Sequence, residues 1–305
     1  MRRLLLWMSR NSWLRRNLPR LWITRRAVRK FMPGESVDEA LKASEKFVGQ
    51  GMGVIFTRLG ETLANDADAD AVAEHYAKLI DTIAERDMNG ELSVKPTQLG
   101  LDFGLDGCLE NMAMLAGRAA PRTLWIDMEG SGYTDQTLEL YEKLKASHPN
   151  VGLCLQAYLK RTYTDFERLV RLGPRIRLVK GAYAEPEDIA WQQRKQVDAN
   201  YLALCVSMLD ARHSGADVFL GLGTHDVDLI AQVAEHAEKI GLAKTDFDVE
   251  MLYGIRADQQ RRLAKAGYKV RVLIAYGEAW YPWYMRRLAE RPANVVFALR
   301  QILPF

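Results

Sequence analysis

Short β-rich runs alternate with longer amphipathic segments along this chain, and that alternation limits the fold more than any other feature. Strands that alternate with helices favour a parallel sheet, because a parallel pair needs a long crossover connection. The mean interval between runs is about 31 residues, which is typical of a (β/α)8 barrel of about 250 residues. The eight runs are 53–59, 92–98, 123–128, 151–158, 175–182, 217–224, 247–253 and 268–275, and helical patterns lie at 37–49, 69–87, 134–147, 187–214 and 227–240.

A barrel and a doubly wound sheet both fit such an alternation. A doubly wound nucleotide-binding sheet usually carries GxGxxG after its first strand, and no such motif follows residues 53–59 here. We therefore predict an α/β fold of the (β/α)8 TIM-barrel type over residues 51–305. Residues 1–50 are predicted to form a separate basic, amphipathic, helical arm.

The positive charge of the chain is concentrated at its N-terminus. Residues 1–30 contain ten Lys and Arg and no Asp or Glu, so the rest has 32 Lys and Arg against 39 Asp and Glu. Leu and Trp recur among these arginines at roughly helical spacing from Leu4 to Trp22, and Pro19 breaks the segment in two. A basic helix with a Leu and Trp face suits an anionic membrane surface, and residues 1–32 are predicted to bind one. A transit peptide, a packing arm on a subunit neighbour or on the barrel underside, and an RNA-binding segment are the alternatives.

Polar side chains gather where the predicted strands end. The carboxyl ends of barrel strands form the active-site face, and buried charge is costly unless it is paired or used. A ring of cations, carboxylates and amides there indicates a ligand with anionic and hydrogen-bonding parts, large enough to include a cofactor. The side chains are Lys95, Gln98, Asp127, Glu129, Gln156, Arg177, Lys180, Tyr183, Thr224, His225, Glu250 and Tyr253.

The last predicted helix follows residues 268–275 and reads WYPWYMRRLAE from Trp280. Pro282 is tolerated only in the first turn, so the helix begins close to it. Arg286 and Arg287 lie about 100° apart on such a helix, so both guanidinium groups can reach one carboxylate or phosphate. Glu290 lies three residues after Arg287 and can hold it. A solvated surface pair is the alternative.

Two classes of site have no sequence support. The five histidines show no HxH or HExxH spacing, so no metal site is predicted. The GxSxG elbow of a Ser/His/Asp hydrolase is also absent. A Schiff-base lyase with Lys95 or Lys180 as its nucleophile remains an alternative, as does a non-enzymatic scaffold that binds RNA or lipid through its arm.

The motifs VKPTQLG, WIDMEG, LCLQAY, RLVKGAY, GLGTHD, EMLYG and WxxRRxxE occur in this order. Together they resemble the proline dehydrogenase family, and most closely its short, monofunctional bacterial members, from about residue 50 to the end. The resemblance implies a distorted (β/α)8 barrel with FAD across the strand ends and the last helix over the barrel mouth. It also implies the oxidation of L-proline to Δ1-pyrroline-5-carboxylate.

The resemblance assigns roles to residues by motif. Arg286 and Arg287 would grip the proline carboxylate with Lys95 as a third cation, while Glu290 orients Arg287. Asp127 would tie the cations together, and Leu252 and Tyr276 would pack on the proline ring. FAD would be held by Gln156, Arg177, Val179, Lys180, Gly181, Ala182, Thr224 and His225.

The family also implies partners. Electrons would pass to a membrane quinone, and a Δ1-pyrroline-5-carboxylate dehydrogenase is a further partner, whereas nucleic acid is not. The enzyme would be cytoplasmic and peripheral at the inner face of the membrane. One departure is Trp283, where the family usually has Tyr. Trp keeps the apolar wall but loses the phenol, so a flavin dehydrogenase of another cyclic amine such as hydroxyproline is an alternative.

Overall fold

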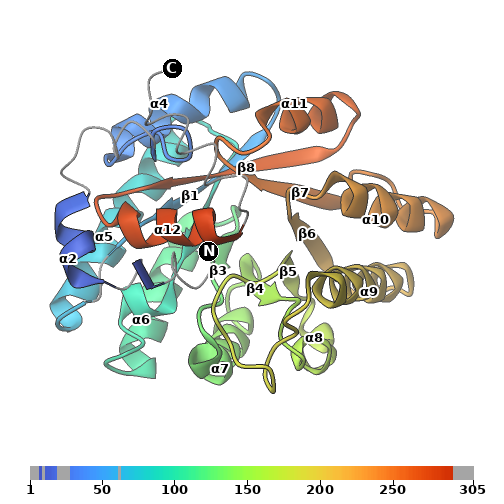
Figure 1. Cartoon of the computed structure of the whole chain (residues 1–305), viewed down its shortest axis with the longest axis horizontal. Coiled ribbons are helices and arrows are strands. Elements are labelled where there is room, and N and C mark those ends of the chain that lie inside the picture. The colour runs from blue at the N-terminus through green and yellow to red at the C-terminus, as the bar shows by residue number, and fades with distance from the viewer. Residues whose placement is uncertain (1–6, 9–10, 19–27, 61–62, 291–305) are drawn as a thin grey trace.

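The computed structural model describes residues 7–8, 11–18, 28–60 and 63–290. Eight parallel strands form one closed barrel in chain order (Figure 1). β8 closes the barrel on β1, with pairs running from Gly53↔Arg271 to Arg58↔Tyr276. The strands are β1 (Gly53–Arg58), β2 (Gly90–Val94), β3 (Leu124–Ile126), β4 (Val151–Gln156), β5 (Arg175–Val179), β6 (Phe219–Gly223), β7 (Phe247–Leu252) and β8 (Lys269–Tyr276).

Helices surround the barrel and bury its outward strand residues. Alternate residues such as Val54, Phe56 and Val272 belong to one apolar core that the barrel shares with the helices. The helices are α2 (Ser12–Asn17), α4 (Val37–Val48), α5 (Asp66–Glu85), α6 (Leu105–Ala119), α7 (Thr134–Lys145), α8 (Thr162–Leu169), α9 (Arg194–His213), α10 (Val227–Lys239), α11 (Ala257–Lys265) and α12 (Trp280–Glu290). Three short 3-10 turns are η2 (Pro96–Leu99), η3 (Ser131–Tyr133) and η4 (Val170–Leu172).

The predicted barrel and its eight strands are confirmed, although strand ends differ from the predicted runs by up to four residues. Two of the differing boundaries have a clear physical reason. The run 92–98 is not one strand, because β2 ends at Val94 and Pro96 begins η2. Proline has no N–H for the strand ladder, so the strand stops before it. The segment 187–214 becomes helical only at Arg194, since its first part bonds to the turn after β4, for example from Trp191 N to Tyr158 O at 2.8 Å.

The N-terminal segment packs on α12, on the side where the strands end. Val28, Phe31 and Met32 share an apolar cluster with Trp280 and Trp283 of α12. The chain passes so close to the loop after β7 that a Cβ on Gly254 would lie 1.5 Å from the Lys30 carbonyl oxygen. Only glycine permits this approach, which explains the glycine of EMLYG. The packing is therefore at the strand ends and not on the barrel underside.

The start of the barrel domain stays a prediction. Ala40, Leu41 and Phe47 of α4 belong to the barrel core, so α4 is packed on the barrel although it precedes residue 51. None of the helices in the described ranges is long and apolar enough to cross a membrane. The same ranges contain no group of three His, Cys, Asp or Glu side chains that could hold a metal ion.

Candidate active site

The inward faces of several strands carry polar residues at every second position. Arg177 on β5 contacts Ser93 on β2 and Asp127 after β3, and these strands are not neighbours of β5. Such contacts are possible only across the barrel interior. Barrel interiors are usually filled by branched apolar side chains, so this charged filling marks a functional interior. The inward set is Glu91, Ser93, Trp125, Asp127, Arg175, Arg177, Asp248, Glu250 and Arg271.

Arg177 is the centre of a buried polar group that leads to the barrel mouth, by which we mean the carboxyl ends of the strands. Its Nη2 atom donates to Ser93 Oγ and to Asp127 Oδ1, both at 2.6 Å. Ser93 Oγ donates to Asp127 Oδ1 at 2.7 Å, and Lys95 Nζ donates to Asp127 Oδ2 at 2.8 Å. Arg177 is 3 % exposed and the Lys95 side chain 19 %. The group thus ends in a partly exposed ammonium at the mouth.

The residues of this group stabilise one another's charged forms. Burial works against the charged form of Lys95, but the Asp127 carboxylate outweighs it and raises the Lys95 pKa. Burial likewise works against ionised Asp127, but Lys95 and Arg177 lower the Asp127 pKa below its usual value. Lys95 therefore stays protonated at neutral pH. A Schiff-base nucleophile must be a neutral amine, so this geometry argues against the lyase alternative at Lys95.

A second layer of charges lies below Arg177. Arg271 on β8 donates to Asp248 at 2.6 Å and pairs with Glu91 at 3.3 Å, while Arg177 Nη1 reaches Glu250 only at 3.4 Å. Burial raises the pKa of Glu250 to about 7, because the attraction of Arg177 is opposed by the nearby Glu91 and Asp248 carboxylates. Glu250 is thus the least well compensated carboxyl group of the layer.

The predicted flavin-binding residues lie on β4, on β5 and in the loops after β5 and β6. Gln156 Nε2 donates to the carbonyls of Met128 and Glu129, whereas its buried Oε1 has no donor among the described residues. Val179 ends β5, and its carbonyl accepts from Ala157 N at 2.8 Å. Gly181 and Ala182 follow in the loop.

Lys180, Thr224 and His225 lie beside the starts of α9 and α10. Lys180 Nζ is held by Asp198 and by Asp226, the latter at 3.0 Å. Thr224 Oγ1 accepts from Asp226 N at 3.2 Å. His225 Nε2 accepts from Leu252 N at 3.4 Å. These contacts fix the loop after β6 against β7, and the flavin-binding role of all three residues stays a prediction.

The two residues predicted to pack on the proline ring, Leu252 and Tyr276, face opposite sides of the barrel wall. Leu252 ends β7 on the same face as Glu250, toward the interior. Tyr276 faces the other way, and its hydroxyl lies 2.8 Å from Nε2 of His75 on α5. Tyr276 is therefore not part of the Arg177 group. Its packing on a substrate stays a prediction.

The predicted anion clamp lies on α12, which follows β8 directly and crosses the strand ends (Figure 1). The turn before it contains Gly277, whose φ of 121° and contact with Leu59 admit no side chain. Arg286, Arg287 and Glu290 belong to α12, but their side chains lie outside the described part of the structure. Trp280 Nε1 donates to Glu35 Oε1 at 3.0 Å, which fixes the helix on the N-terminal segment.

Sequence reasoning assigned only Asp127, Arg177 and Glu250 of the nine inward residues and missed the other six. Ser93, Glu91, Asp248 and Arg271 received no role, although they bridge or balance the residues that did. The signal was present as a period of two in the strands, for example in Glu91-x-Ser93-x-Lys95 and Asp248-x-Glu250. Polar residues at alternate positions of a buried strand mark its inward face.

Glu250 should make the stability of the fold depend on pH. The folded chain raises the Glu250 pKa from 4.5 to about 7, so the folded state binds this proton more tightly than the unfolded state. The resulting stability is full below the unfolded pKa and is lost as the pH rises through the folded pKa. The loss is on the order of 3 kcal/mol. We expect Glu250→Gln to become more stable relative to the parent chain between about pH 5 and about pH 8 in urea unfolding. Parallel profiles, like those expected for exposed Glu167→Gln, would contradict the assignment.

Comparisons with known proteins agree with this arrangement. A family model described as proline dehydrogenase matches residues 40–300. Proline dehydrogenase 1 of Bacillus subtilis (strain 168) is 34 % identical, covering 99 % of both chains. The proline dehydrogenase of Deinococcus radiodurans is 34 % identical over 90 % of this chain and 89 % of its own.

Solved structures support the fold. The structure of proline utilization A from Bdellovibrio bacteriovorus, inactivated by N-propargylglycine, has a TM-score of 0.80 at 20 % identity, covering 94 % of this chain and 38 % of that chain. Proline utilization A from Corynebacterium freiburgense gives 0.74 at 21 % identity, covering 99 % and 34 %. The extent of the family match and the full-length relatives decide the question of kinship: this chain belongs to the proline dehydrogenase family.

Proposed function

We propose that this protein oxidises L-proline to Δ1-pyrroline-5-carboxylate, with FAD as its cofactor. The observation that carries the proposal is the buried group of Arg177, Asp127 and Lys95, which presents a permanently charged ammonium at the mouth beneath α12. Family membership supplies the reaction, and the names of the relatives supply the substrate.

The residues at the strand ends fit a flavin. Gln156 Oε1 is a buried acceptor that lacks a donor among the described residues, and an imide N–H of a flavin ring would satisfy it. Arg177 is a buried cation at the same end of the barrel, suited to a ring that gains negative charge on reduction. FAD, when bound, supplies the hydride acceptor, and the protein supplies orientation and charge.

The chain's own residues would act on proline by positioning it. The substrate carboxylate meets Lys95, whose charge is held by Asp127, and the two guanidinium groups predicted from α12. Leu252, on the inward face of β7, supplies an apolar wall for the ring methylenes. A carboxylate clamped at one end and a ring held at the other fix C5 of proline in one orientation. Solvent can take the amine proton, so no dedicated base is required.

The first test is an anaerobic titration of the FAD-loaded protein with L-proline. We expect the visible flavin band to bleach. In Lys95→Met we expect the KM for proline to rise roughly tenfold or more, because a charge-assisted hydrogen bond to the carboxylate is lost. Exposed Lys78→Met is the matched control and should behave like the parent enzyme.

Three outcomes would contradict parts of this proposal. If the chain takes up no flavin, the proposed FAD dependence is wrong. If hydroxyproline bleaches the flavin band and proline does not, the substrate is hydroxyproline, the alternative that Trp283 suggests. If the KM for proline is unchanged in Lys95→Met, Lys95 does not bind the proline carboxylate, although the proposed reaction is not contradicted.

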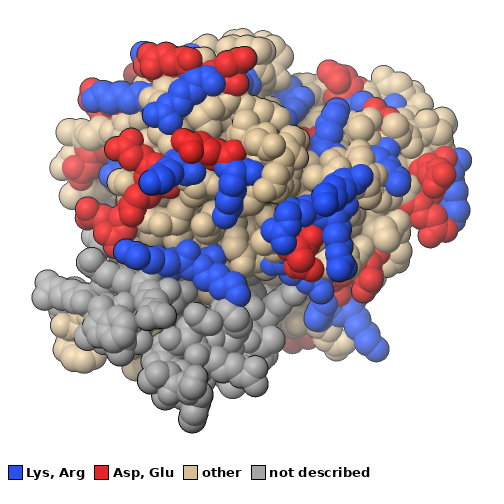
Figure 2. Space-filling view, turned by 90° about the horizontal axis from the view of Figure 1, so that it is seen from above, with Lys and Arg blue, Asp and Glu red and all other residues tan. Residues whose placement is uncertain are grey.

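We further infer that electrons pass to a membrane quinone and that the enzyme binds the inner face of the cytoplasmic membrane through residues 1–32. Trp7 and Trp13 are 58 % and 62 % exposed, whereas Leu14 and Leu18 pack toward α12. On the face shown in Figure 2, Lys and Arg lie interspersed with Asp and Glu. That face therefore presents no large positive patch as an alternative contact for an anionic membrane. A soluble Δ1-pyrroline-5-carboxylate dehydrogenase would then take the product.

Membrane binding can be tested without disturbing the α12 packing. We expect the full chain to sediment with vesicles that contain anionic lipid, and we expect Trp7→Ser/Trp13→Ser to lose most of that binding, because the two exposed rings are removed. Phe103→Ser/Tyr163→Ser removes two other exposed rings and serves as the control. Equal sedimentation of both double variants would refute the inferred membrane contact.

A further inference from the structure

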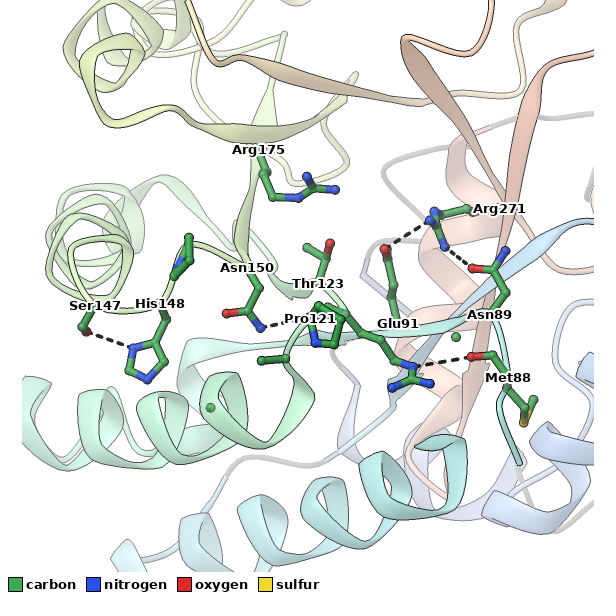
Figure 3. A pocket seen from close by; sticks show the side chains of 15 residues that line it. Met88, Asn89, Glu91, Pro121, Thr123, Ser147, His148, Asn150, Arg175 and Arg271 are labelled. Carbon is green, nitrogen blue, oxygen red and sulfur yellow. Dashed lines mark hydrogen bonds and ion pairs between the residues drawn. The ribbon is translucent and has the colours of Figure 1, made fainter. Parts of the chain in front are cut away.

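The opposite end of the barrel holds an open cavity of about 930 Å³ that the proposed reaction does not use. It lies where β2, β3, β4 and β5 begin, whereas Lys95 follows the end of β2 and α12 follows the end of β8. Figure 3 shows the side chains that line it. Its volume is that of a pocket for a small molecule. Among the described residues that line it there are three arginines and one carboxylate, and no Phe, Tyr or Trp: the charged ones are Arg122, Arg175, Arg271 and Glu91.

The single carboxylate is already used. Glu91 Oε2 accepts from Trp125 Nε1 at 2.7 Å, and its other oxygen pairs with Arg271 at 3.3 Å. Arg271 is further balanced by Asp248 and donates to Asn89 Oδ1. Glu91 and Arg271 thus form a closed set, which leaves the other two arginines without a carboxylate from the cavity wall.

Those two arginines keep donors for a ligand. Arg175 extends into the cavity, and Figure 3 draws no hydrogen bond or ion pair between it and the other lining residues. Its buried Nε has no partner among the described residues, and its guanidinium lies 4.1 Å from the centre of the Phe219 ring. Arg122 donates through Nε to the Met88 carbonyl at 3.5 Å, a weak contact that leaves its two terminal nitrogens.

The surroundings add to the positive charge. Lys145 donates to the carbonyl of Pro149, a residue of the cavity wall. Burial and the charge of Arg175 lower the Lys145 pKa to about 8, while the exposed Asp217 opposes this change. Arg122, Arg175 and Lys145 are each only partly exposed, so their positive charges favour a compensating anion in the cavity.

We propose that this cavity is a second binding site, for a small non-aromatic anion recognised by a carboxylate or a phosphate, with Arg175 and Arg122 as its main contacts. Planar guanidinium groups match the paired oxygens of both groups. The described wall holds no Phe, Tyr or Trp, and its one aromatic ring is the small imidazole of His148, which bonds to Ser147, so it offers little stacking surface for a nucleotide base. Arg175 and Arg177 lie on the same inward face of β5, roughly 7 Å apart along the strand, so the cavity adjoins the polar interior.

Calorimetric titration of the full FAD-loaded chain with inorganic phosphate and with citrate, at constant ionic strength set by sodium chloride, tests the proposal. We expect saturable binding of at least one probe, and the tighter probe identifies the preferred group. Arg175→Gln should weaken it roughly tenfold or more, since a charge-assisted contact is lost. Arg122→Gln should weaken it as well and provides an independent test if Arg175→Gln does not fold.

Two control variants distinguish anion binding in this cavity from anion binding at other cationic side chains. Arg171→Gln removes an exposed arginine near the start of β5 and should leave the affinity unchanged. Lys95→Gln removes the ammonium at the mouth and should also leave it unchanged, which distinguishes the cavity from the proposed proline site. Absence of saturable binding, equal affinities in the parent chain and both cavity variants, or loss of binding in Lys95→Gln would overturn the proposal.

Discussion

A guanidinium buried inside the barrel is the constraint on which the site depends. Arg177 is 3 % exposed, and its charge is tolerable only because Ser93 and Asp127 meet it across the interior while Glu250 lies below. These partners come from strands that barrel closure brings together. The same contacts fix Asp127, and Asp127 fixes Lys95 at the mouth. Stability of the fold and geometry of the proposed substrate site therefore rest on one set of ion pairs.

The closed interior also separates two surfaces with different chemistry. At the mouth, the ion pairs end in a cation beneath α12, which the N-terminal segment holds through Trp280 and the cluster around Phe31. At the other end, the ion pairs of the interior end in Arg271 and Glu91, beside a cavity whose other arginines have no carboxylate partner in the cavity wall. Glu250 lies between these ends and is sensitive to the charges of both layers.

The sequence predicted the architecture because strand and helix periodicities are local properties. All eight strands were found, although several predicted runs extended beyond the carboxyl end of their strand, and the run 92–98 did so because the ring of Pro96 ends β2. The interior contacts were not predictable in the same way. Whether Ser93 or Glu129 reaches Arg177 depends on register and closure, since residues far apart in sequence must meet across the barrel. The contact of Lys30 with Gly254 is likewise tertiary.

A double-mutant cycle between Asp127 and Arg177 tests the central claim most directly. The free energy of unfolding would be measured in urea for Asp127→Asn, for Arg177→Gln and for the double variant. Asp127→Asn leaves Arg177 with only the long ion pair to Glu250, and Arg177→Gln leaves Asp127 paired with Lys95 alone. Each single change should therefore be destabilising, by up to about 3–5 kcal/mol. If the ion pair organises the interior, the double variant should lose clearly less than the sum, with a coupling above about 1 kcal/mol. Losses that add to within about 0.5 kcal/mol would contradict the account.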